Sequence, residues 1–321
     1  MRKGTKSMIF TAVSLVITGA LLFAVVMTAC GWDFSRLQTA SFETVTYEVG
    51  EGFRDITIDT DTALVRFAAS ENGTCRVVCQ EEENRRFDVG VTNGALTVRA
   101  VDERKWYEQI GICFQSPEVT VFLPEAEYGS LVIAGSTGDI IIPEGFVFDG
   151  MDVRLSTGDV DCRASSSGLL LVKTSTGDIR LSNLSSEEIN LTVSTGHISV
   201  RSVNCGGAAA ISVSTGKTEL ADVSCGSLRS TGSTGDISLK NVIAAEMISI
   251  ERSTGDVRLE KCDAENLTIE TDTGDVSGSL LTDKIFLAKT DTGKADVPET
   301  VSGGKCEIRT DTGNIHMEID G

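Results

Sequence analysis

Residues 169–181 read LLLVKTSTGDIRL, and the pattern within them recurs through the second half of this 321-residue chain. Ser-Thr-Gly or Asp-Thr-Gly stands at ten regularly spaced places, at intervals of 19 or 20 residues. The glycines at these places are Gly138, Gly158, Gly177, Gly196, Gly216, Gly235, Gly255, Gly274, Gly293 and Gly313. A fixed period of this length is typical of repeat proteins, in which each unit packs on the next.

Apolar and polar residues alternate on both sides of each glycine. After Gly177, Ile179 and Leu181 are apolar and Arg180 between them is polar, while residues 189–191 belong to a second alternating stretch before the next glycine. A period of two predicts a strand with one buried face. One repeat is therefore a strand, a tight turn, a second strand and a looser polar turn.

Such a unit cannot bury its apolar faces alone, and stacking of successive units closes a continuous core. The sequence predicts an all-β fold, a single-stack β-solenoid of about ten 19–20-residue coils. With coils about 4.8 Å apart the rod is roughly 48 Å long. A leucine-rich repeat has a similar period, but its Leu/Asn ladder is absent here. A multi-sheet sandwich would not keep so regular a period.

The ten glycines are predicted to be structural. A turn this tight needs a residue at positive φ, which glycine adopts without steric cost. We expect Gly235→Val to destabilise the protein more than an equivalent change at an outward strand position.

Residues 31–130 alternate less regularly. Ala63 stands where a repeat glycine belongs, so we interpret the region as a β-rich cap with irregular first coils, which covers the end of the stack. A separate small β-domain is the alternative. Residues 103–111, which carry a Trp and a Tyr, are expected to be a loop held by its rings or an exposed aromatic contact. The predicted division is a cytoplasmic tail at 1–7, a membrane span at 8–29, the cap at 31–130 and the solenoid at 131–321.

The N-terminus predicts a membrane anchor. Residues 8–29 are 22 uncharged, mostly apolar residues after a basic tail, and a helix of that length crosses a hydrocarbon core of about 30 Å. The positive-inside rule leaves the tail in the cytoplasm and the bulk of the chain outside. We favour an uncleaved anchor, because a cleaved signal peptide has a shorter apolar region. A lipoprotein modified at Cys30 is the runner-up.

Charge excludes other classes of function. The chain has 28 basic and 47 acidic residues, a net charge of −19, and only two histidines. Three basic residues precede the span, so the remainder has a net charge of −22. Nucleic acids bind Lys/Arg clusters, so they are not expected partners. Two histidines leave little room for zinc sites or histidine-based acid–base chemistry.

The chain resembles the bacterial putative-adhesin family, a domain of unknown function. The matching features are the single N-terminal span, the lead that ends in YGSLVIAGSTGD at residues 128–139, and the series STGDV, STGDI, STGHI, STGKT, DTGDV, DTGKA and DTGNI. The resemblance covers most of the chain after about Trp32. It implies an envelope-facing β-solenoid linked to adhesion or envelope regulation, and it carries over no catalytic residues.

Aspartate follows six of the ten glycines and would form a column in the stack. Adjacent carboxylates repel, and a bound Ca²⁺ would relieve this, with Asp272, Asp275 and Asp291 as the candidate ligands. His197 and Lys217 interrupt the column, so we favour aspartate as a turn residue and expect no cofactor.

The nine cysteines contain no Cys-x-x-Cys pair. Cys75 and Cys79 lie about 13 Å apart along one strand and cannot form a disulfide there. Cys205 and Cys225 take equivalent places in adjacent coils, which permits a disulfide geometrically. Cys162 and Cys306 are interpreted as small core residues, and the odd total favours few or no disulfides.

We predict a non-enzymatic, membrane-anchored solenoid that binds an envelope polymer or protein partner. An accessory or sensor of an envelope-stress system is the alternative, and a carbohydrate-active β-helix enzyme is the third reading. The last coil, ending NIHMEIDG at residues 314–321, lacks a cap. We therefore expect that this end self-associates end to end with another copy, or that Glu318 and Asp320 protect it.

Overall fold

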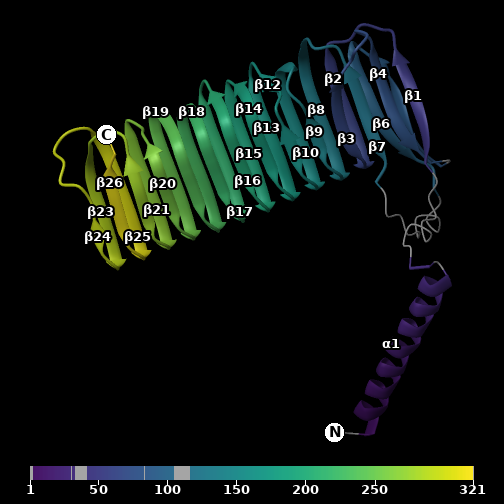
Figure 1. The fold of residues 1–321 in the computed structure, drawn as a ribbon, viewed down its shortest axis with the longest axis horizontal. Helices are drawn as coiled ribbons and strands as arrows, with labels where there is room; N and C mark the ends of the chain where they lie inside the picture. The colour runs from purple at the N-terminus through teal and green to yellow at the C-terminus, as the bar shows by residue number, and fades with distance from the viewer. Residues whose placement is uncertain (1–2, 30, 33–41, 83, 105–115, 321) are drawn as a thin grey trace.

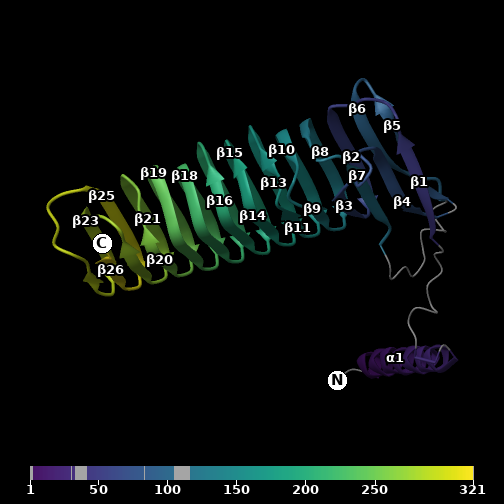
Figure 2. The same cartoon turned by 45° about the horizontal axis from the view of Figure 1, so that its top comes forward.

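The computed structural model describes residues 3–29, 31–32, 42–82, 84–104 and 116–320. In these described residues, one helix, α1 (Lys3–Ala29), is followed by 26 strands that wind into a rod-shaped stack, seen from the side in Figure 1 and turned by 45° in Figure 2. The predicted fold class is confirmed, since the chain is an all-β solenoid of about ten turns with one apolar N-terminal helix.

Helix α1 is apolar and uncovered. Its residues Met8–Ala29 have a mean hydropathy of 2.5, and nearly all of their side chains are exposed, although Met27 near the end of the helix is buried. The helix therefore has the length and composition of a membrane anchor or a signal sequence. Cys30, the residue of the lipoprotein alternative, lies outside the described residues, as does most of segment 103–111.

The strands before the turn glycines form one side of the solenoid. Their spatial order is β5 (Arg85–Thr92), β6 (Ala95–Asp102), β2 (Asp55–Thr62), β8 (Glu127–Thr137), β10 (Val147–Thr157), β13 (Leu169–Thr176), β15 (Glu188–Thr195), β17 (Ala208–Thr215), β18 (Thr218–Thr234), β19 (Ile237–Thr254), β21 (Asn266–Thr273), β25 (Gly304–Thr312) and β23 (Lys284–Thr292).

The strands after the glycines form the other side. Their order is β1 (Glu43–Val49), β4 (Cys75–Glu81), β7 (Glu118–Leu123), β3 (Leu64–Ala69), β9 (Ile140–Ile142), β11 (Val160–Cys162), β14 (Ile179–Ser186), β16 (Ile198–Cys205), β18, β19, β20 (Val257–Cys262), β22 (Val276–Leu280), β26 (Ile315–Ile319) and β24 (Ala295–Asp296). The short β12 (Ser165–Ser166) pairs with the start of β10. Strands β18 and β19 belong to both sides because each continues around one edge of the solenoid.

The core lies between the two sides. In the repeat coils, neighbouring strands are parallel, so equivalent residues of successive coils stack, as Leu170, Ile189 and Ala209 do. These side chains are buried in columns that run the length of the rod. Alternation along each strand thus supplies a continuous apolar interior.

The stretch predicted as a looser polar turn is largely strand. The second arm of a regular coil bends at a single residue in the left-handed region, for example Asn183 with φ 56° and Ser202 with φ 53°. The next residue points inward again, as buried Leu184 and Val203 show. Asparagine tolerates this conformation better than most residues, which is why polar residues gather at the bend.

The N-terminal end of the stack is closed by antiparallel strands. Pairs β1–β4, β4–β7 and β5–β6 are antiparallel, whereas all other paired strands of the described residues are parallel. Ala63 stacks directly beneath Gly138, because a Cβ at Gly138 would lie 1.9 Å from the Ala63 carbonyl oxygen. The interpretation that Ala63 stands where a repeat glycine belongs is confirmed.

The last two coils are stacked in the reverse of their chain order. Strand β25 pairs with β21 on one side and with β23 on the other, and β26 lies in the same way between β22 and β24. The expectation that residues 314–321 form the uncovered end is therefore wrong for Ile315 and His316, which β24 covers. The open end is formed by β23 and β24, where Phe286 and Ala288 are half-buried and Leu287 is 51% exposed. End-to-end self-association remains a prediction and now concerns these strands.

Candidate functional site

The turn glycines form a tightly packed column along one edge of the rod. All ten have positive φ, between 126° and 157°. A Cβ on Gly158 would lie 2.0 Å from the carbonyl oxygen of Gly138 in the preceding coil, and the same clash repeats along the column. Glycine is thus required both for the backbone conformation and for the close approach of successive turns.

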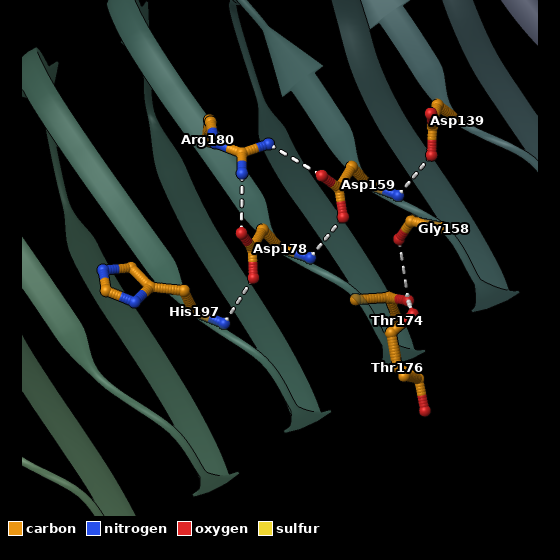
Figure 3. Close-up of polar contacts among 8 residues, drawn as sticks. All are labelled: Asp139, Gly158, Asp159, Thr174, Thr176, Asp178, Arg180 and His197. Carbon is orange, nitrogen blue, oxygen red and sulfur yellow. Dashed lines mark hydrogen bonds and ion pairs between the residues drawn. The ribbon is translucent and has the colours of Figure 1, made fainter.

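A ladder of aspartates lies beside the glycines (Figure 3). The backbone N–H of Asp159 donates to Oδ1 of Asp139 at 2.9 Å, that of Asp178 to Oδ1 of Asp159 at 2.8 Å, and that of His197 to Oδ1 of Asp178 at 2.9 Å. Each carboxylate therefore caps the backbone of the next turn. This use explains the aspartate column without a bound cation.

The ladder stops at His197 and starts again at Asp236. From there Asp256, Asp275 and Asn314 each donate a backbone N–H to the acceptor before them, and Lys294 donates to Asn314 Oδ1 at 3.1 Å. This sequence of bonds follows the spatial order of the coils rather than the chain order. The aspartates and the asparagine after the turn glycines indicated such bonds in the sequence, because both residue types commonly accept from backbone N–H groups at turns.

Arg180 links two carboxylates of the ladder. Its Nη1 lies 2.9 Å from Asp159 Oδ2 and its Nη2 lies 2.6 Å from Asp178 Oδ2. Partial burial would raise the pKa of Asp159, but the N–H of Asp178 and the guanidinium of Arg180 outweigh it and lower that pKa. Asp159 therefore stays charged at neutral pH, and its contribution to stability is lost only as the pH falls towards acid values.

The three candidate calcium ligands are not brought together. Asp275 belongs to the ladder, Asp291 pairs with Lys289 at 3.2 Å, and the coil of Asp311 lies between those of Asp272 and Asp291. Within the described ranges, no group of three His, Cys, Asp or Glu side chains has the spacing of a metal site. Calcium binding stays a prediction that the next experiment tests.

Asp159→Ala is expected to lower the free energy of unfolding by about 1–2 kcal/mol, because it removes an acceptor of a backbone N–H and a charge-assisted bond. Asp159→Asn should cost less, since an amide oxygen can still accept from Asp178. Denaturant unfolding of the full chain in detergent, with EDTA and with calcium, measures both. Asp272→Ala is the control and should have no effect in either buffer. A calcium-dependent loss at Asp272 would instead support the metal site.

All seven described cysteines are buried and free, and Cys30 and Cys113 lie outside the described residues. Burial raises the pKa of Cys162 and of Cys225 to about 12, so both thiols are protonated at neutral pH. They behave as small core residues.

A shallow polar groove runs beside the second half of the ladder. It has a volume of about 380 Å³, and Ser238 and Ser277 form its floor between the longer side chains of Glu219, Arg258 and His316. A second groove, near the first half of the ladder, is lined by Arg163, Arg180, His197, Arg201 and Glu219 among others. We call this side of the rod, from Asp161 to His316, the ladder face. Sequence reasoning missed it, because its shape depends on which outward residues are small.

His316 lies in the ladder face between two carboxylates, with Nδ1 3.0 Å from Asp296 and Nε2 3.2 Å from Glu318. The bond to Glu318, followed by that to Asp296, raises the pKa of His316 above its ordinary value near 6.5. The stability that the charged form contributes is therefore present below about pH 6.5 and is lost as the pH rises through the folded pKa.

We expect NMR titration to give His316 a pKa above about 6.5, and Glu318→Gln to lower it. The chain has only two histidines, so His197→Gln assigns the two signals. An unshifted pKa for His316 in the unmodified protein would contradict the paired geometry.

Comparison with known proteins identifies the family of this chain. The domain described as Toastrack DUF4097 matches residues 53–216 and 208–321. The chain belongs to the Toastrack DUF4097 family. The family match thus extends over the cap strands from β2 onwards and over every turn glycine. No curated protein matches the chain.

Three solved structures are similar to this Toastrack DUF4097 chain. One is a crystal structure described as a putative lipid binding protein from Parabacteroides distasonis, with 17% identity, a TM-score of 0.49 and coverage of 74% of this chain and 95% of that one. A putative adhesin from the same species has 11% identity, a TM-score of 0.47 and coverage of 87% and 98%. A putative adhesin from Bacteroides fragilis has 14% identity, a TM-score of 0.41 and coverage of 87% and 97%.

Proposed function

We propose that the chain is a membrane-anchored, extracytoplasmic binding scaffold of the adhesin type, with no catalytic activity, which binds a polar polymer of the cell envelope along its ladder face. The observation that carries this proposal is the ladder face itself, a polar surface that extends over successive coils of a rod. A repeating surface matches a repeating ligand, because each coil can present an equivalent set of contacts.

The side chains of the ladder face suit a ligand rich in hydroxyl groups. Ser238 and Ser277 offer small donors and acceptors at the floor of the groove, while Glu219 and Arg258 offer charges of both signs at its sides. A sugar polymer uses such groups for hydrogen bonds without needing a deep pocket. The uniform short turns support a non-enzymatic role, since active sites on repeat scaffolds are usually built from longer loops.

The N-terminus supports the proposed location. Arg2, Lys3 and Lys6 precede the apolar segment, and the chain after it has a net charge of −22. This asymmetry favours a cytoplasmic tail and an external rod. Proteolysis of intact cells that carry a C-terminal epitope tag tests the orientation: the tag should be lost from intact cells, and protection of the tag until the membrane is opened would contradict it.

A pelleting assay tests the binding. The full chain in detergent should sediment with insoluble envelope polymer, and the double variant Ser238→Arg/Ser277→Arg, which fills the groove, should remain in solution. Ser249→Arg, at an outward position of β19 on the other side of the rod, is the matched control and should still sediment. Equal sedimentation of all three proteins would contradict the ladder face as the binding site, and release of soluble sugar fragments would contradict the non-enzymatic role.

A further inference from the structure

Among the described residues, Arg252 is the most deeply buried arginine. The third residue before each turn glycine points into the solenoid, and this position holds Thr174, Val193 and Val213 in three successive coils. In the coil of Gly255 the same position holds Arg252, whose side chain is only 3% exposed. A buried guanidinium is unusual because removing its charge from water has a large free-energy cost unless other groups compensate for it.

At three neighbouring core positions, the residue differs in type from the residues that stack on it in the adjacent coils. Ser230 stands between Ile211 and Ile250, and Thr218 stands between Ile198 and Ile237. Gly232 pairs with Arg252, and a Cβ at Gly232 would lie 2.1 Å from Arg252 Nη1.

The sequence shows the origin of this change. Residues 230–235 read STGSTG, so an extra Ser-Thr-Gly precedes the one in phase. The extra tripeptide places the hydroxyl of Ser230 between Ile211 and Ile250, and it places a residue without a side chain next to Val213. Together they leave the core space that the guanidinium occupies.

The guanidinium is only partly satisfied. Arg252 Nη2 donates to Thr218 Oγ1 and to Ser230 Oγ, both at 3.0 Å. Nε and Nη1 are fully buried and have no acceptor among the described residues. No described carboxylate pairs with Arg252, and the adjacent Glu251 points outward and pairs with Arg229 at 3.6 Å.

The unpaired donors of Arg252 show which kind of ligand would complete the cluster. The arginine offers only donors, and the two hydroxyls that accept from Nη2 still have a hydrogen each to donate. The guanidinium keeps its charge even when buried, so the cluster has a net charge of +1 and needs an acceptor.

We propose that the solenoid core binds a small monovalent anion of the halide class, such as chloride, against Nε and Nη1 of Arg252. A monatomic anion suits the position because Nε and Nη1 are enclosed by the described residues, and it is the smallest anion that can accept from both N–H groups. The anion neutralises the buried charge and accepts the two donors that the protein leaves unpaired. The stability of the middle of the rod is then linked to the halide concentration outside the cell.

Denaturant unfolding of the full chain in detergent tests the linkage, with sodium chloride exchanged for sodium gluconate at constant ionic strength. Above the dissociation constant, the ratio of folded to unfolded protein should rise about tenfold for each tenfold rise in chloride. Arg252→Met should abolish this dependence. Arg229→Met, which removes an exposed arginine of the preceding coil, should retain it. No chloride dependence in the unmodified protein, or an equal dependence in Arg252→Met, would overturn the proposal.

A second measurement does not depend on the folding of a variant. Crystals of the unmodified protein grown or soaked in bromide should give an anomalous peak within about 3.5 Å of Arg252 Nε or Nη1, the contact distance of a halide with an N–H group. A bromide peak there supports the site. A fully occupied water with no anomalous signal would overturn it.

Discussion

Gly235→Val is expected to lower the free energy of unfolding by at least about 3 kcal/mol, or to prevent folding, because strain at positive φ and overpacking add at one position. Gly235 has a φ of 126°, which a β-branched residue rarely adopts, and a Cβ there would lie 2.0 Å from the carbonyl oxygen of Gly216. Neither residue can move alone, since Gly255 stacks on Gly235 in the same way.

Gly90→Val is the matched control for this change. Gly90 lies in β5 without a positive φ, and no atom lies within 4 Å of the place where its Cβ would be. Valine favours strands, so the control should be neutral or slightly stabilising. Thermal and denaturant unfolding of both variants in detergent measures the difference. Equal melting temperatures would show that neither the φ value nor the stacking of the turns limits residue choice.

Ile308→Ala is expected to lower the free energy of unfolding by about 2–4 kcal/mol. Ile308 in β25 is fully buried and stacks between Ile269 of β21 and Ala288 of β23. A cavity enclosed between two neighbouring coils is not filled by movement of the last coil alone. If β25 were the last strand of the rod, one face of this side chain would be open and the loss would be smaller.

Ile285→Ala provides the comparison within the adjacent strand. Ile285 points outward from β23 in register with Lys305 and is 43% exposed, so its replacement should cost less than about 1 kcal/mol. Denaturant unfolding of the two alanine variants measures the ratio. A cost at Ile285 equal to that at Ile308 would contradict the outward position of Ile285 on β23.

The repeat could be predicted from the sequence because every coil must meet the same physical requirements. Each turn needs a glycine, and each strand needs alternating side chains with one apolar face, so period and fold class follow together. The cap and its Ala63 coil could be predicted for the same reason. The bend at Asn183 could not, because a single left-handed residue leaves the alternation of the strand almost unchanged.

The order of the last coils could not be predicted from the period, since all of these coils present similar apolar columns. One signal did point to it. Pro298 lies two residues after the end of β24, and proline cannot donate a backbone bond to a further strand, so a coil that contains it is suited to an edge. Lys294 also points to an end position, because its side chain cannot accept a hydrogen bond from the backbone N–H of a further coil. Asn314 can, and its side chain accepts the bond from the backbone N–H of Lys294.

The aspartate column was predictable as a turn feature, but its role as a chain of backbone caps depends on the stacking distance. The arginine cluster also had a sequence signal, namely Arg252 at a position where the alternation requires an inward side chain. The ladder face had none, since its grooves arise from small side chains such as Ser238 and Ser277 that pass for ordinary polar positions.

The reversed order of the last two coils has a consequence for biosynthesis. A growing chain delivers its coils in sequence order and tends to fold from the N-terminal side. Residues 284–296 emerge before residues 304–319, yet their neighbour in the finished rod is the later segment. Residues 284–296 must therefore either remain unpaired during synthesis or pair temporarily with β21, in the position that β25 has in the finished fold. The last coils therefore cannot pair one after another in chain order. The final strand pairs of this end form only after residue 319 has been synthesised.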